Sequence, residues 1–400
     1  MGVGVPTAAV GPEVDTVDSG VRADLSVLGR AVAAVLPAWI VARVLVAAAL
    51  VTAHLSVRSV RPRNPTALQR VHDGLLGWDA GWYLSIADHG YLAAGRQSLR
   101  FFPLFPLLGR WLGHLPGLGT GDALVLVANA ASLLAMAALL VLVEHDVLRR
   151  LPLDPGLARR SVWLLALAPS AYSLVLAYED ALLLLCAVVV FLGIRTDRWW
   201  WAAAAGAAAG ASRPVGVLLV VPVAVELWSR RSTLSGSGAR VAGGAALAAP
   251  VVGAGAYLAW VDHRFGTPWL PFTVQQESGH RGQLAVPFDA MWHDGLAALH
   301  GHHLGSALHI PWILVCAALV VVAWRRLPRS YALFAAAVLV VSLTSTNLDS
   351  FERYALGAFP LVIAASTCTS RRPVEVVVLV ASGAAMAAYA TLGFLGIVVP

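Results

Sequence analysis

A carboxylate set among aromatic rings is the first candidate for chemistry in this sequence. The segment WDAGWYLSIADHGY at 78–91 places Asp79 beside Trp78, Trp82 and Tyr83. Flat aromatic faces can stack on sugar rings or rest at lipid headgroups. A partly desolvated carboxylate beside them can take a proton from an attacking hydroxyl. The alternative is that Asp79 only caps a short interfacial helix that begins at the next residue, and the two roles are compatible.

Two acids and an arginine occupy short turns between apolar stretches. The AYED turn holds Glu179 and Asp180, which can bond substrate hydroxyls or simply be solvated. Arg213 lies in an SRP turn between two short apolar segments. A charge at that depth usually has a partner or a ligand, and arginine suits phosphate through bidentate bonds. Pairing of Arg213 with one of the two acids is the structural alternative.

A second arginine stands in a similar position near the C-terminal end. Arg353 lies in FERYALGAFP at 351–360, at the start of an apolar segment, and the same argument makes it a phosphate candidate. Its neighbour Glu352 is the alternative salt-bridge partner. Tyr354 follows directly and is counted with Arg353 as a substrate-binding candidate.

Two further segments carry polar groups. RFFPLFPLL at 100–108 is amphipathic, so it either lines a lipid-substrate groove with Arg100 near a phosphate or is a structural re-entry into the next helix. The segment 262–282 contains Gln275 and further side chains that could bond a sugar or an acceptor. These are Gln276, Glu277, His280 and Arg281.

Histidines at 300, 302 and 303 form the only other conspicuous polar group. Three histidines in one loop without a distant fourth ligand are a weak metal signal, so a solvated loop is favoured and no metal is predicted. The chain has no GxGxxG, Walker, HExxH or CxxC motif, so no nucleotide cofactor or zinc site is predicted. The three cysteines lie in apolar runs and imply no disulfide framework.

The elements that must position these residues are membrane helices. Of the 400 residues, 58% are hydrophobic and 12% charged, about half the charged share of soluble domains, and mean hydropathy is +0.74. This composition excludes a soluble globular protein. Because a basic nucleic-acid-binding surface needs a soluble surface, the net charge of +6 is not interpreted as nucleic-acid binding. Eleven apolar segments are predicted to form a polytopic all-α bundle. They are 31–53, 121–143, 161–178, 181–194, 199–211, 214–229, 241–261, 310–324, 330–346, 354–370 and 374–398.

The arginines predict the orientation of this bundle. With the N-terminus inside, the short inner segments hold 14 arginines and the short outer turns only Arg213 and Arg353, as the positive-inside rule requires. Residues 1–30 are predicted to be a disordered cytoplasmic tail and residues 31–400 a single membrane domain. Its long outer loops are about 54–120, with interfacial helices, and 262–309. Arg43, in the middle of the first segment, stays unassigned.

Together these segments resemble the PIG-V family of membrane mannosyltransferases within the GT-C superfamily. The residues that carry the resemblance are WDAGWYLSIADHGY (78–91), FFPLFPLL (101–108), AYEDALLLL (177–185), SRPVG (212–216) and SFERYALGAFPLV (350–362). The resemblance implies a GT-C bundle, an active site on the outer face, and inverting transfer from a polyprenyl-phosphate-linked mannose without a sugar nucleotide.

The resemblance also implies roles for single residues. Asp79 matches the acid that acts as base or orients the acceptor hydroxyl, while Arg213 and Arg353 become donor-phosphate candidates. Asp79 is followed by Ala80 rather than by a second acid. This departs from the superfamily's frequent acid pair, so any helper acid must come from the AYED turn.

The sequence therefore predicts a hexosyltransferase, most specifically a mannosyltransferase, in a bacterial plasma membrane, with a glycolipid or protein acceptor and no nucleic-acid partner. A lipid or sugar transporter or flippase is the main alternative, although transporters place charges near the midplane within inverted repeats. A structural membrane-assembly protein is the third. The enzyme hypothesis requires Asp79, Glu179, Arg213 and Arg353 to meet at one outward cavity.

Overall fold

A computed structural model describes residues 13–62, 64–149, 151, 154–234, 236–277, 280–286, 292 and 309–399, and side chains from residue 26 onward. Within these ranges every regular element is helical, which confirms the all-α prediction. The longer helices are α1 (Glu13–Val60), α5 (Thr120–Leu142), α7 (Asp180–Arg195), α8 (Trp199–Ser212), α10 (Ser237–Phe265), α14 (His309–Arg326), α15 (Arg329–Leu343) and α18 (Arg372–Phe394).

Shorter helices join or cap these. They are α2 (Ala67–Asp73), η1 (Gly74–Leu76), α3 (Asp79–Ala94), η2 (Arg96–Arg100), α4 (Leu104–Gly113), η3 (Val143–Val147), α6 (Leu157–Leu167), η4 (Ala171–Leu174), η5 (Pro214–Leu219), α9 (Val220–Ser229), α11 (Leu270–Gln275), α16 (Phe351–Leu356) and α17 (Pro360–Cys368). The short helices α2, α3 and α4 occupy the long loop that was predicted after the first apolar segment.

Five helices of the described chain are long and apolar enough to cross a membrane, which makes this an integral membrane protein. They span Ser26–Val60, Thr120–Val147, Ser237–Phe265, His309–Arg326 and Arg372–Phe394. The predicted count of eleven membrane helices is not confirmed, because the remaining apolar segments form shorter helices or are interrupted. The first helix also begins at Glu13, well before the predicted start at residue 31.

Prolines interrupt two of the predicted segments. The segment 161–178 was expected to be one helix, but α6 ends at Leu167 and the chain continues as the short helix η4. Ala168 is extended, with ψ 144°, because a following proline disfavours helical backbone. Pro360 likewise begins a new helix, so the segment 354–370 is divided between α16 and α17.

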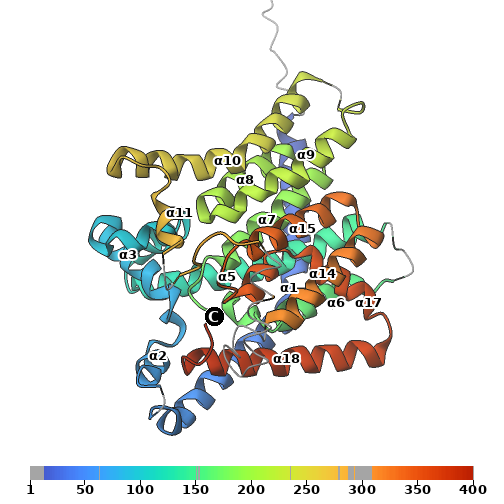
Figure 1. Cartoon of the computed structure of the whole chain (residues 1–400). Coiled ribbons are helices and arrows are strands. Elements are labelled where there is room, and N and C mark those ends of the chain that lie inside the picture. Colours follow the sequence, from blue (N-terminus) through green and yellow to red (C-terminus); the bar gives the residue numbers. More distant parts are fainter. Residues whose placement is uncertain are drawn as a thin grey trace, which may run out of the picture.

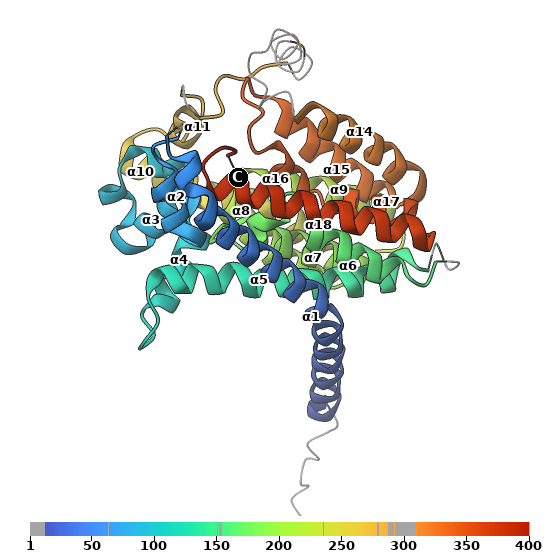
Figure 2. The same ribbon diagram turned by 90° about the horizontal axis from the view of Figure 1, so that it is seen from below.

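One end of the bundle gathers the segments that were expected to lie outside the membrane. In both views α2, α3 and α11 lie together at this end, while α17 and α6 lie towards the other (Figures 1 and 2). Figure 2 also shows the first part of α1 leaving the other helices. We refer to the end formed by α2, α3 and α11 as the loop end.

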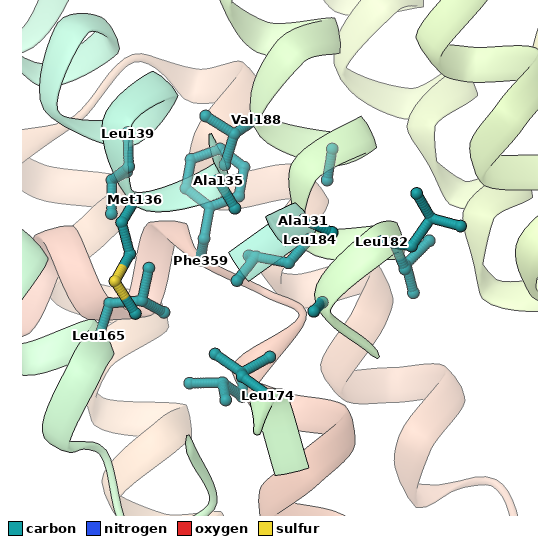
Figure 3. Close-up of a cluster of buried hydrophobic side chains, with 14 of the residues drawn as sticks. Ala131, Ala135, Met136, Leu139, Leu165, Leu174, Leu182, Leu184, Val188 and Phe359 are labelled. Atoms are coloured by element: carbon teal, nitrogen blue, oxygen red, sulfur yellow. The ribbon is translucent and has the colours of Figure 1, made fainter. Parts of the chain in front are cut away.

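Close backbone contact holds α8 against α10. A Cβ atom added to Gly253 of α10 would collide with the backbone oxygen of Ala207, and one added to Gly210 of α8 with that of Pro250. Glycines at both crossing points therefore let the two backbones approach, as small residues do between membrane helices. Elsewhere the interior is filled by side chains such as Met136 of α5, which packs in the apolar cluster of Figure 3.

The unassigned Arg43 has a structural role in this core. Its Nε donates to Asn129 Oδ1 at 3.0 Å, and its Nη2 donates to Leu174 O at 3.3 Å and to the Ser132 hydroxyl. The guanidinium carbon also lies 4.1 Å from the centre of the Trp39 ring. Arg43 thus ties α1 to α5 and η4, because a charge in a helix bundle needs internal partners.

A second polar cluster lies far from the loop end. Arg195, the last residue of α7, binds Asp146 at 2.5 Å and Glu226 at 2.7 Å, and Tyr331 donates to Asp146 at 2.9 Å. Asp180 begins the same helix, so its 16 residues separate the two polar ends by about 24 Å. An acid in the first turn and an arginine in the last also complement the helix dipole.

Candidate active site

A cavity of about 290 Å³ brings most of the predicted site residues together. All of them except Trp78 and Trp82 line it. They are Asp79, Tyr83, Arg100, Glu179, Asp180, Arg213, Gln275, Arg353 and Tyr354. The four residues that the enzyme hypothesis required to converge therefore do so, although they come from α3, the start of α7, the end of α8 and α16.

Asp79 is held at the cavity by an unusual turn. It is the first residue of α3, and the preceding Trp78 has φ 59°, a conformation that costs a non-glycine residue about 1–3 kcal/mol. The Trp78 indole NH donates to Gly393 O at 2.9 Å, and Arg70 stacks on its ring at 3.9 Å. Trp78 therefore anchors the turn, and its role in substrate binding stays a prediction.

The capping alternative for Asp79 does not hold. The capping position is occupied by Trp78, and no side chain caps α3. Instead, Asp79 Oδ2 accepts a hydrogen bond from Arg353 Nη2 at 2.9 Å. Ser350, just before α16, also has positive φ, at 63°. Asp79 and Arg353, which form this ion pair, therefore each come shortly after a residue with strained backbone.

Arg353 continues the network to Asp180. Its Nε lies 3.7 Å from Asp180 Oδ2, and its guanidinium carbon lies 5.0 Å from the centre of the Tyr178 ring. Arg353 Nη1 is buried without a hydrogen-bond partner among the described residues. The expected partner Glu352 is not used, because it binds His309 Nδ1 at 2.7 Å.

Arg213 pairs with both acids of the AYED turn. Its Nη1 lies 2.5 Å from Asp180 Oδ1 and 3.1 Å from Glu179 Oε1. Pro214 forces the backbone out of α8 at Arg213, which is extended with φ −162°. The turn is tight, since a Cβ on Gly216 would meet the backbone of Ala209. Arg213 therefore forms the ion pairs that were the structural alternative to phosphate binding.

Tyr83 completes this side of the site. Its hydroxyl donates to Glu179 Oε2, and its ring makes edge contacts with Phe101 and Phe105 at 5.0 Å. Burial raises the pKa of Glu179, and Arg213 opposes that shift only in part. Burial and the neighbouring Glu179 also raise the pKa of Tyr83, so the phenol stays a hydrogen-bond donor.

The three cavity acids differ in access. The Asp79 side chain is 28% exposed, compared with 5% for Glu179 and 8% for Asp180. Burial lowers the pKa of Arg213, but Glu179 and Asp180 more than reverse that effect and raise it. Glu179 and Asp180 are therefore engaged in holding arginine, while Asp79 remains open to a molecule in the cavity.

Apolar side chains form another part of the cavity wall. Leu183, Leu184 and Ala187 of α7 face the cavity together with Val338 and Val341 of α15. Val341 is also 44% exposed, so the apolar wall is not fully enclosed. The cavity thus joins a charged end to an apolar side.

Arg100 and Gln275 stand at the loop end of the cavity. Arg100 Nη1 donates to His280 Nδ1 at 3.1 Å and stacks on Phe101 at 4.6 Å. Gln97 lies 2.6 Å from His280 Nε2, so residues from the two long loops interlock here. Trp82 lies behind this rim, where it stacks on Phe101 with ring centres 6.1 Å apart. Our prediction that it binds substrate is not supported by a place in the cavity wall.

Several cavity residues were missed or only loosely predicted. Arg281 was one of several polar residues in its segment, yet it lines the cavity and stacks on Tyr354 at 4.4 Å. Ser342 and Ser345 also line it and were not singled out. The polar run TSTN after the apolar α15 was the available signal. The predicted histidine cluster at 300–303 lies outside the described residues.

Comparison with known proteins identifies the class. The model of glycosyltransferase family 87 matches residues 103–348. The crystal structure of ArnT from Cupriavidus metallidurans bound to undecaprenyl phosphate is similar with TM-score 0.48 and 16% identity, over 80% of this chain and 72% of that one. Its apo structure gives 0.43 and 15%, over 79% and 71%. No curated protein matches the chain significantly.

Proposed function

Because this chain belongs to glycosyltransferase family 87, we propose that it moves a hexosyl unit from a polyprenyl-phosphate-linked donor to an acceptor hydroxyl at the cavity. The observation that carries the proposal is the exposure of Asp79 in a cavity that has both a charged end and an apolar wall. A lipid-linked sugar has the same two-part character, with a polar head and a long apolar chain.

Asp79 is the proposed base. Arg353 binds its Oδ2, and we assign the other oxygen, Oδ1, to the acceptor hydroxyl. As the acceptor oxygen forms its bond to the anomeric carbon, its proton passes to Asp79. The bond from that carbon to the phosphate oxygen breaks, and the lipid phosphate leaves with the electron pair. Attack from the face opposite the phosphate inverts the configuration at the anomeric carbon.

Arginines stabilise the leaving phosphate in this scheme. Preorganised donors aimed at developing negative charge lower the barrier without reorganising during the reaction. Arg353 supports this role, because its buried Nη1 lacks a hydrogen-bond partner among the described residues. Arg213 is a weaker candidate, since Glu179 and Asp180 already neutralise it. The helper acids of the AYED turn act through Arg213 rather than on the substrate.

The finer assignments rest on the sequence resemblance. Mannose as the sugar, a PIG-V-like specificity, the GT-C architecture and a glycolipid or protein acceptor are proposed on the motifs that carry it. So are a bacterial plasma membrane as the location, a cytoplasmic N-terminus and an active site on the outer face. The bias of the arginines supports that orientation.

Incubation of purified protein with synthetic polyprenyl-phosphate sugars and a membrane lipid extract tests the function. Mass spectrometry should find a product that is heavier by one hexose, with mannose as the preferred sugar. The Asp79→Asn variant should lose about 10²- to 10⁴-fold in turnover, the usual contribution of a positioned base. The change keeps the size of the side chain, so the variant should fold in detergent.

Asp88→Asn is the matched control, because Asp88 lies on the same helix and is exposed. Near-normal turnover by Asp79→Asn would remove Asp79 as the base. Transport of the lipid-linked sugar between leaflets without any transferred hexose would instead support the flippase alternative and contradict the enzyme proposal.

A further inference from the structure

Arg281 differs from Arg213 and Arg353, which also line the cavity, in having no carboxylate partner among the described residues. Arg213 and Arg353 are each ion-paired with two acids of the site. Arg281 instead donates from Nη2 to Ser342 O at 2.5 Å, and from Nε and Nη2 to the Ser345 hydroxyl at 3.2 and 3.0 Å. These neutral acceptors hold the guanidinium in place without cancelling its charge.

The charge of the cavity is consequently unbalanced. Its wall carries four guanidinium groups, from Arg100, Arg213, Arg281 and Arg353, and three carboxylates, from Asp79, Glu179 and Asp180. One positive charge is left over in this lining. Burial lowers the pKa of Arg281, and the positive Arg213 and Arg353 nearby add to that effect. An anion bound here would relieve this repulsion.

The position of Arg281 fits one part of a lipid-linked donor. Its partner Ser342 belongs to α15, the helix whose Val338 and Val341 form the apolar wall. Arg281 therefore lies where the charged end of the cavity meets the apolar side. In a lipid-linked sugar, the group at that junction between head and chain is the phosphate.

Tyr354 places Arg281 next to the remaining arginines. Its ring centre lies 4.4 Å from the guanidinium carbons of both Arg281 and Arg213, and 5.3 Å from that of Arg353. An aromatic face attracts cations and so offsets part of their mutual repulsion. Tyr354 is thus a positioning residue that keeps three positive side chains together.

We propose that Arg281 binds the phosphate of the lipid-linked donor and takes up the negative charge that appears there when the sugar is transferred. This assignment rests on the proposed function, and it moves the main phosphate contact from the ion-paired Arg353 and Arg213 to a residue without a carboxylate partner among the described residues. The guanidinium can bond two phosphate oxygens at once, which an ammonium cannot.

The binding of two lipid probes that have the same prenyl chain tests this assignment. Decaprenyl phosphate and decaprenol differ only in the phosphate, and native mass spectrometry of the purified protein in detergent can compare their dissociation constants. Wild-type protein should prefer decaprenyl phosphate. Arg281→Gln should lose about 10- to 100-fold of that preference, the usual effect of losing charge-assisted hydrogen bonds.

Arg264→Gln is the matched control, because Arg264 is exposed at the end of α10 and lies outside the cavity wall. It should keep the wild-type preference. If the Gln variant fails to fold, Arg281→Met serves instead, since its flexible apolar chain fills a buried site without polar groups. The same loss is expected.

The two proposals fail in different ways. Retention of the full phosphate preference by a folded Arg281 variant overturns the assignment of Arg281, while transfer by the wild-type protein leaves the proposed function standing. Absence of both transfer and phosphate preference in the wild-type protein overturns the proposed function, and the assignment of Arg281 with it.

Discussion

At the scale of single residues, the site is organised by which charges are neutralised and which are left available. Arg213 and the acids Glu179 and Asp180 neutralise one another, and all three side chains are largely buried. Asp79 keeps an exposed edge, and Arg281 has only neutral partners among the described residues. The groups proposed to contact the substrate are therefore those whose charge is exposed or not neutralised. The other charged groups hold the side chains of the site in position.

This organisation predicts that Arg213 is needed for stability. Arg213→Gln would leave the buried Glu179 without its positive partner and Asp180 with only Arg353, whose Nε is 3.7 Å away. Removing one member of a buried ion pair costs about 3–5 kcal/mol. Thermal unfolding in detergent should show a clear fall in Tm. The raised pKa of Glu179 allows it to take up a proton, so the fall should be smaller at acid pH.

Arg110→Gln provides the comparison for that experiment, because Arg110 is an exposed residue of α4 outside the cavity. Adding Glu179→Gln to Arg213→Gln should restore part of the stability, because it removes the buried charge that has lost its ion pair. Equal Tm values for Arg213→Gln and Arg110→Gln would contradict the assigned role of the pair.

At the scale of elements, close helix contacts and proline breaks bring the site together. Pro214 ends α8 at Arg213, and Gly216 lets the chain fold back on that helix. The α8 helix is itself held against α10 by Gly210 and Gly253, whose missing side chains let the backbones touch. The position of Arg213 thus depends on small residues at a helix crossing.

Two glycines of α10 should therefore respond in opposite ways to the same change. Gly253→Ala puts a Cβ against the backbone oxygen of Ala207, which must shift at a cost of about 1–3 kcal/mol. Gly255→Ala meets no atom within 4 Å, and alanine favours a helix over glycine by up to about 1 kcal/mol. Thermal unfolding should show a lower Tm for the first variant and an equal or higher Tm for the second.

Gly253→Ala should also lower the transferase activity, whereas Gly255→Ala should not. If Gly253→Ala unfolds at the same temperature as Gly255→Ala, the α8–α10 crossing is looser than described here and does not control the position of Arg213.

At the scale of the whole molecule, two polar clusters lie at opposite ends of the bundle. The cavity cluster begins at Asp180, and the second cluster is centred on Arg195 at the other end of the same helix. The second cluster contains Arg195, which the positive-inside rule places in the cytoplasm. The separation therefore agrees with a cavity that opens on the outer side.

Labelling with a membrane-impermeant maleimide tests this orientation. With Cys186, Cys316 and Cys368 replaced by alanine, Leu92→Cys in α3 should react in intact cells, and Thr233→Cys after α9 should not. Both positions are exposed in the fold, so both should react after permeabilisation. Reaction of Thr233→Cys in intact cells would reverse the proposed orientation.

Much of the site could be predicted because its residues stand out in short stretches of the sequence. Asp79, the AYED turn, Arg213 and Arg353 stood out as polar residues at the ends of apolar segments, and all of them line the cavity. Trp78 and Trp82 show the limit of that reasoning, because neither is among the residues that line the cavity, and their role in substrate binding stays a prediction. Trp78 has positive φ and its indole NH donates to Gly393 O, while Trp82 stacks on Phe101, and neither contact follows from proximity to Asp79 in the sequence.

The sequence by itself determined the membrane class, the helical nature of the chain and the segregation of its arginines, because these depend on composition and on the order of residues along the chain. Only the tertiary structure decided which charges cancel. Arg353 meets Asp79 across 274 positions of the chain, and Arg281 meets serines rather than acids. Pairing depends on which distant segments pack together, and it leaves Asp79 with a partly exposed carboxylate and Arg281 without a carboxylate partner among the described residues.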